Sequence, residues 1–106
     1  MGIFSSTPSN NFAGVSGFKV GVLMLETSHV LLPGNVQNAT TFNFPVIYQA
    51  VEGLSFPQLA SGDPVGDELI KAAVLKLEAQ GVSVIMGACG SFAQWQNRIT
   101  QYASVP

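Results

Sequence analysis

The sequence predicts an α/β fold with a mainly parallel sheet flanked by helices. Three nearly unbroken apolar runs of strand length occur along the chain, as expected for strands that are buried on both faces. Segments with apolar residues at helical spacing follow the second and third runs, which gives the order strand, loop, strand, helix, strand, helix. The chain has 106 residues, enough for one domain with its own core.

The first strand is predicted at residues 18–25, after a leader at residues 1–17 that is rich in Ser, Asn, Gly and Pro and is expected to be flexible. Residues 26–43 are polar and rich in turn formers, and loops of this length in compact domains tend to be functional. The second strand is predicted at residues 44–51, with Pro45 near its start, where proline is tolerated.

The clearest helix follows a linker at residues 53–62. Asp63 is expected to cap it, Pro64 suits its first position, and Gly81 ends it. Its apolar face consists of Leu69, Ile70, Ala73, Val74 and Leu77.

The third strand is predicted at residues 82–86, and a second helix should then run to about Ala103. Residues at three- and four-residue steps along this helix are expected to pack in the core rather than to bind a ligand. They are Phe92, Trp95, Ile99 and Tyr102.

The composition restricts the partners. Charged residues make up only 9% of the chain, against about 25% in ordinary soluble domains, so we expect part of the surface to be covered, in a homo-oligomer or by another domain.

Four Lys and Arg residues cannot form a phosphate-binding stripe, which argues against nucleic acid as a partner. No segment has the roughly 20 apolar residues of a membrane span, so no membrane partner is expected. The N-terminal segment lacks the features of a signal peptide, and the single cysteine fits a reducing cytoplasm.

Cys89 is the strongest candidate for chemistry. It lies between a predicted strand and a predicted helix, and ligands of parallel sheets bind beyond the carboxyl ends of the strands. A helix start favours the thiolate, which is the reactive form. The glycines Gly87 and Gly90 would allow a sharp turn there. Free cysteine is also a common small core residue, and position alone leaves both interpretations open.

Other polar residues reach the same edge of the predicted sheet. Glu26 could hold a cationic group of a substrate or simply be solvated. Thr27, Ser28 and Ser91 could donate hydrogen bonds to a carboxylate, although Ser91 could instead cap its helix. One cysteine and one histidine do not make a metal site, and no glycine-rich phosphate loop is present, so we expect neither a metal nor a cofactor.

Several segments in register carry a resemblance to a known family. They are residues 21–27, residues 33–38 with 41–46, and residues 81–96, where a strand runs into a Cys-Gly turn and a helix. Over residues 18–106 the chain resembles a less characterised branch of the aspartate/glutamate racemase superfamily. The resemblance implies an isomerase with two similar α/β domains, one cysteine from each, and neither pyridoxal phosphate nor a metal.

The resemblance also implies roles for individual residues. Cys89 corresponds to the first-domain cysteine, which exchanges the α-proton of an amino acid or related small carboxylate. Gly90 and Ser91 would grip the substrate carboxylate, and Glu26 and Thr27 would contact the substrate. Gly90-Ser91 replaces the more usual Asn-Thr, and Glu26 replaces an aspartate.

The second domain that the resemblance implies is not within these residues, so we expect the chain by itself to lack racemase activity. A decarboxylase of the same superfamily, which needs one cysteine, is an alternative for the complete protein. Two alternatives come from other classes. One is a non-enzymatic, oligomeric α/β ligand-binding module in which Cys89 only packs. The other is a hydrolase with a Cys89–His29 pair, because both residues are predicted at the same edge of the sheet and Cys89 partly matches a nucleophile elbow.

Overall fold

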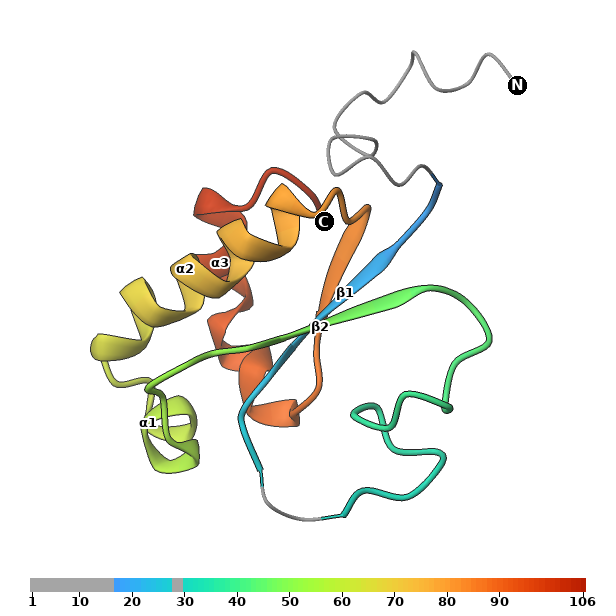
Figure 1. Cartoon of the computed structure of the whole chain (residues 1–106). Coiled ribbons are helices and arrows are strands. Elements are labelled where there is room, and N and C mark those ends of the chain that lie inside the picture. Colours follow the sequence, from blue (N-terminus) through green and yellow to red (C-terminus); the bar gives the residue numbers. More distant parts are fainter. Residues whose placement is uncertain (1–16, 28–29) are drawn as a thin grey trace.

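The fold is a three-stranded parallel sheet with the first strand in the middle. The computed structural model describes residues 17–27 and 30–106. Strand β1 (Val20–Met24) lies between β2 (Val46–Ala50) and β3 (Val84–Gly87), and both pairings are parallel (Figure 1). The predicted α/β class with a parallel sheet and helices is therefore confirmed.

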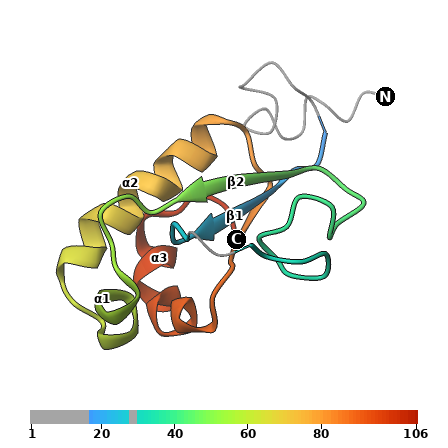
Figure 2. The ribbon, with the colours of Figure 1, turned by 60° about the horizontal axis from the view of Figure 1, so that its bottom comes forward.

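The two faces of the sheet are covered by different kinds of structure. The helices α1 (Phe56–Ser61), α2 (Val65–Ala79), η3 (Gly90–Trp95) and α3 (Gln96–Tyr102) lie to one side, and the long loop that leads into β2 lies to the other (Figure 1, Figure 2). Side chains alternate between the faces of a strand, so Leu23 points into the helix side while its neighbour Val22 belongs to the loop side. Both side chains are almost completely buried.

The buried side chains of the helix side form one continuous core. Trp95 lies at its centre and is fully buried, and its indole N–H donates a 2.8 Å hydrogen bond to the carbonyl oxygen of Leu59 in α1. Its ring fits against Gly66 of α2, where even a Cβ atom would lie 2.5 Å from the ring. The guanidinium of Arg98 lies 4.5 Å from the ring centroid, within the range of a cation–π contact. Trp95 thus joins α1 and α2 to η3.

Helix α2 starts at Val65, with Pro64 at the N-cap rather than at the first helical position predicted for it, and it ends near the predicted stop at Gly81. The Asp63 carboxylate accepts a 3.0 Å hydrogen bond from the Val65 amide, and Gly81 has a left-handed backbone (φ 76°) after the last turn. The Lys19 ammonium group adds a cap that was not predicted, because it donates a 2.8 Å hydrogen bond to the carbonyl oxygen of Gln80. Lys19 is only 4% exposed, so its aliphatic stem is covered by protein.

Three predicted elements need correction. The linker predicted at residues 53–62 contains α1, which starts with a capping box between Ser55 and Gln58. The second predicted helix is a 3₁₀ helix for its first six residues, and its first bond runs from the Phe92 amide to the Cys89 carbonyl. The first strand begins at Val20 rather than at Phe18, which is 67% exposed.

Residues 1–16 of the predicted leader lie outside the described residues. Within residues 17–27 and 30–106, no helix combines the length and the apolar character that crossing a bilayer requires.

Replacing Gly66 with alanine is expected to destabilise the fold. Alanine favours a helix over glycine by about 1 kcal/mol, but the new methyl group would overlap the buried Trp95 ring, and overpacking of this kind costs about 1–3 kcal/mol. We expect a lower denaturation midpoint for Gly66→Ala in urea unfolding. Gly90→Ala is the control, because its Cβ would meet nothing within 4 Å. Equal midpoints for the two variants would contradict the packing described for Trp95.

Candidate functional site

The segments that follow the three strands meet at one edge of the sheet. The Val51 amide, just after β2, donates a 2.8 Å hydrogen bond to the carbonyl oxygen of Met24 in β1. The Ala88 amide, just after β3, donates a 2.8 Å hydrogen bond to Leu23 of the same strand. The residues that follow β1 and β3 therefore start side by side, at the edge where parallel sheets bind ligands.

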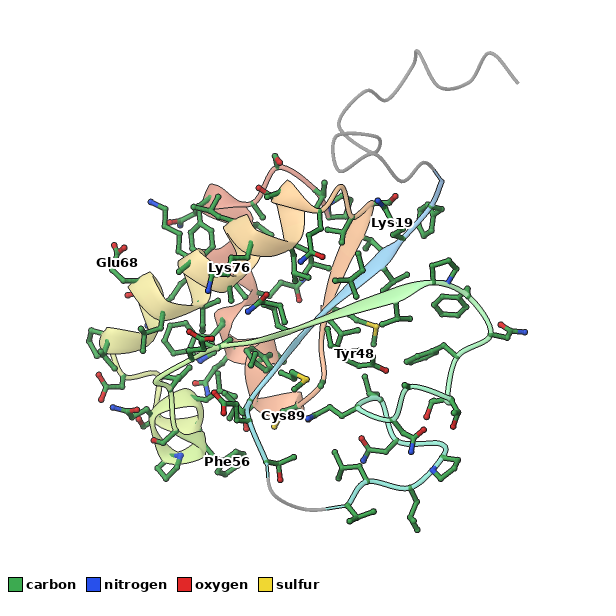
Figure 3. All side chains as sticks on the ribbon, in the orientation of Figure 1. Lys19, Tyr48, Phe56, Glu68, Lys76 and Cys89 are labelled. Carbon is green, nitrogen blue, oxygen red and sulfur yellow. The ribbon has the colours of Figure 1, made fainter. Side chains whose placement is uncertain are left out.

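A cleft opens on the helix side of the sheet near this edge. It lies between β3 and the η3–α3 segment and has a volume of about 360 Å³. Its walls are largely apolar, with Leu23 and Ile85 from the sheet and Phe92 from η3. Cys89 and Gly90 line it where β3 runs into η3. Figure 3 labels Cys89 at this turn.

Cys89 is half-buried in this position. Its backbone is extended (φ −117°, ψ 138°), and its carbonyl oxygen accepts a 3.0 Å hydrogen bond from the Phe92 amide as the 3₁₀ helix begins. The side chain packs beside the core and also borders the cleft. The thiol is thus placed between a packed interior and a cavity large enough for a small molecule.

The other predicted site residues are only partly brought together. Gly90 lines the cleft with Cys89, whereas Ser91 does not line it. Glu26 and Thr27 are exposed after the end of β1, at the same edge of the sheet but outside the cleft lining. Ser28 and His29 lie outside the described residues, so the structure gives no geometry for a pair between His29 and Cys89.

Polar residues of the cleft escaped the sequence analysis. Gln96 and Thr100 line it from α3, and Thr100 also donates a 2.9 Å hydrogen bond to the carbonyl oxygen of Asn97. The signal was present, because Gly90, Ala93, Gln96 and Thr100 follow at steps of three and four residues. It was overlooked because the adjacent aromatic stripe of the same segment dominates the hydrophobic pattern.

The described lining of the cleft carries no charged side chain. In the same part of the chain, residues 17–27 and 30–106, no group of three His, Cys, Asp or Glu side chains could hold a metal ion. Two exposed ion pairs lie on α2, where Lys76 is 3.9 Å from Glu52 and Asp67 is 3.6 Å from Arg98. Exposed pairs of this kind contribute about 0–1 kcal/mol each.

Taken together, the fold and the cleft define a small α/β domain with a cysteine thiol at the carboxyl edge of a parallel sheet. The chain is 34% identical over 102 residues to a dimethylsulfoniopropionate lyase from Durusdinium sp. clade D, which covers 93% of this chain and 34% of the relative. It is 30% identical over 95 residues to dimethylsulfoniopropionate lyase 2 from Emiliania huxleyi, covering 87% and 27%. The chain spans about a third of the length of the curated relatives it matches. No family model and no solved structure matches it.

These relatives correct the functional interpretation of the sequence. Their names are those of dimethylsulfoniopropionate lyases, so the assignment to the aspartate/glutamate racemase superfamily and the prediction of an amino-acid racemase are wrong. The alternative of a non-enzymatic binding module is not supported either, since the relatives are named as enzymes. A Cys89–His29 hydrolase also differs from the activity that these names state. Each alternative had relied on single motifs or on position, whereas the similarity extends over most of the chain.

Gly87→Ala is expected to disturb the cysteine turn. A Cβ at Gly87 would lie 2.7 Å from the Cβ of Phe92, so η3 must shift to accommodate it. We expect a stability loss of about 1–3 kcal/mol and a change in the rate at which iodoacetamide alkylates Cys89. Gly90→Ala, which meets no neighbouring atom, should leave the unfolding midpoint in place. An unchanged alkylation rate in Gly87→Ala would show that η3 does not set the thiol position.

Tyr102 provides a test at high pH. Burial raises its pKa to about 12, the carboxylates of Asp67 and Glu68 act in the same direction, and Arg98 opposes them. The neutral phenol is therefore favoured in the folded state, and its contribution to stability is present below pH 10 and is lost as the pH rises toward 12. Absorbance titration of the folded protein should show a phenolate step near pH 12 that disappears in Tyr102→Phe. A Tyr102 phenolate step near the ordinary value of 10 would contradict this burial.

Proposed function

We propose that this chain forms part of a lyase that acts on dimethylsulfoniopropionate and that Cys89 is its catalytic base. The observation that carries the proposal is the position of Cys89, the only cysteine of the chain, in a cleft at the carboxyl edge of the sheet. The names of the relatives supply the reaction class and the substrate. The substrate is a small carboxylate, the class of ligand that the sequence also predicts.

The proposed reaction is a β-elimination. The Cys89 thiolate removes a proton from the carbon next to the substrate carboxylate. The electron pair of that C–H bond forms a carbon–carbon double bond, while the bond from the neighbouring carbon to the sulfonium sulfur breaks and its electrons remain on sulfur. Dimethyl sulfide and acrylate are released, and the Cys89 thiol then returns its proton to solvent. General bases placed in this way accelerate proton transfer by about 10²–10⁴-fold.

The surroundings of Cys89 suit this chemistry. Negative charge develops on the substrate carboxylate as the proton leaves, and hydrogen-bond donors fixed in advance stabilise such charge. The first amide groups of a helix have no partner within it, which makes those of Gly90 and Ser91 available for this purpose. The apolar walls of the cleft strengthen these interactions by limiting water.

The remaining predicted residues fit the same substrate. Glu26 carries a negative charge at the adjacent strand end, where it can face the sulfonium cation, and Thr27 can donate a hydrogen bond to the carboxylate. The mechanism needs only acid–base chemistry, in keeping with the expectation of no cofactor. It also needs a reduced thiol, which favours a reducing compartment such as the cytoplasm. Exposed apolar side chains such as Leu32 and Phe56 favour a homo-oligomer.

Substitution of Cys89 tests the proposal. The readout is dimethyl sulfide released from dimethylsulfoniopropionate, measured together with acrylate. We expect Cys89→Ala to lower kcat by at least about 100-fold, because the general base is removed. Cys89→Ser keeps the size of the side chain but replaces the thiol with a much weaker acid, so it should be similarly impaired.

Ser61→Ala is the control, because Ser61 lies in α1 outside the cleft lining and its hydroxyl only donates a 3.3 Å hydrogen bond to the Gln58 carbonyl oxygen. Its kcat should stay within a few-fold of the parent value. A Cys89→Ala protein that releases dimethyl sulfide at the parent rate would exclude Cys89 as the base.

A further inference from the structure

The loop on the helix-free side of the sheet is held together by its own polar side chains. The Thr41 hydroxyl accepts a 2.9 Å hydrogen bond from the Gly34 amide and donates one of 2.5 Å to the Asn35 carbonyl. The side-chain amide of Asn38 donates a 2.7 Å hydrogen bond to the Leu31 carbonyl oxygen. These bonds hold residues 31–41 together, and the side chains of Tyr48 and Gln37 connect this segment to the sheet.

Tyr48 is one of the residues that connect the loop to the sheet. It lies on β2 directly opposite Val22 of β1, on the face away from the helices, and it reaches toward the loop (Figure 3). Its hydroxyl lies 2.7 Å from the Val36 carbonyl oxygen and 3.2 Å from that of Asn38. One proton serves both acceptors, so the shorter bond to Val36 dominates.

The two carbonyl groups that Tyr48 holds are on either side of Gln37. The Gln37 side-chain amide reaches back to the end of β1, where it donates to the Leu25 carbonyl oxygen at 3.4 Å and lies 3.7 Å from the Met24 sulfur. Leu25 directly precedes Glu26 and Thr27. It also follows β1 at the level at which Cys89 follows β3, because Leu23 pairs with Gly87.

We propose that Tyr48 is a positioning residue of the Cys89 site. Its hydroxyl fixes the loop around Gln37, and the Gln37 amide in turn holds residues 25–27 at the carboxyl edge of the sheet beside Cys89. The effect that we infer on catalysis rests on the proposed function. The structural connection from Tyr48 through Gln37 to Leu25 rests only on the hydrogen bonds described above.

Tyr48→Phe removes the hydroxyl and keeps the ring. The loss of one hydrogen bond of ordinary strength is expected to raise hydrogen exchange in residues 35–41 and the alkylation rate of Cys89, each about fivefold. Gln37→Ala should raise Cys89 alkylation to a similar extent. The Cys89 alkylation rate of the double variant should equal that of either single variant. It should not show the two increases multiplied, because both substitutions break the same link.

Tyr102→Phe is the matched control. It removes the hydroxyl of the other tyrosine of the chain, which is buried without a hydrogen-bond partner among the described residues, and it should leave Cys89 alkylation unchanged. Parent-like alkylation in Tyr48→Phe and Gln37→Ala, or an equal increase in Tyr102→Phe, would overturn the inference. Gln37 lies in a surface loop, so Gln37→Ala provides the same test if Tyr48→Phe fails to fold.

The lyase assay separates this inference from the proposed function. In an active protein, Tyr48→Phe should raise KM for dimethylsulfoniopropionate about fivefold while kcat stays within twofold, because the proposed substrate contacts of Glu26 and Thr27 are displaced and the Cys89 thiol is retained. An unchanged KM would overturn the positioning role. If the complete lyase that contains this chain shows no activity while Cys89 alkylation still depends on Tyr48, only the proposed function is contradicted.

Discussion

The buried indole of Trp95 is the contact on which the site depends. It fills the space between α1 and α2, and its hydrogen bond to Leu59 fixes the angle of the ring. Because Trp95 is the last residue of η3, the same contact fixes the helix that begins immediately after Cys89. The position of the thiol at the cleft therefore depends on a packing contact six residues away in the sequence.

The two sides of the sheet are stabilised by different forces. On the helix side, large apolar side chains leave water together, and their contribution scales with buried area at about 25 cal/mol per Å². On the loop side, side-chain hydrogen bonds to backbone carbonyls carry most of the order, and each contributes about 0.5–1.5 kcal/mol net. The proposed chemistry lies at the carboxyl edge of the sheet, next to both of these differently stabilised sides.

Much of the fold could be predicted from the sequence. The apolar runs gave the three strands, and helical spacing with Asp63 and Gly81 gave α2 nearly to the residue. The short helix α1 was missed because hydrophobic periodicity needs more than its six residues, although the Ser55–Gln58 capping box was readable. The 3₁₀ geometry of η3 could not be foreseen, since the same apolar spacing suits either kind of helix.

The position of Cys89 in the fold was predictable from the sequence, whereas its chemistry remains a proposal. The prediction placed this cysteine between a strand and a helix at the carboxyl edge of the sheet, and a cleft lined by Cys89 and Gly90 lies near that edge. Residue types at that edge are compatible with removal of a proton from many small carboxylates, so they could not distinguish a racemase from a lyase. The link from Tyr48 to Gln37 was invisible because it joins a strand to a loop whose path no local pattern encodes.

The central place of β1 has a consequence for the newly made chain. This strand is the first of the three to leave the ribosome, yet its two neighbours are β2 and β3, which are made later. Until both arrive, an apolar segment with two open edges remains available to other chains, and parallel pairing over long stretches of sequence is slow. Chaperone binding during translation would protect this segment most in the interval before β3 emerges.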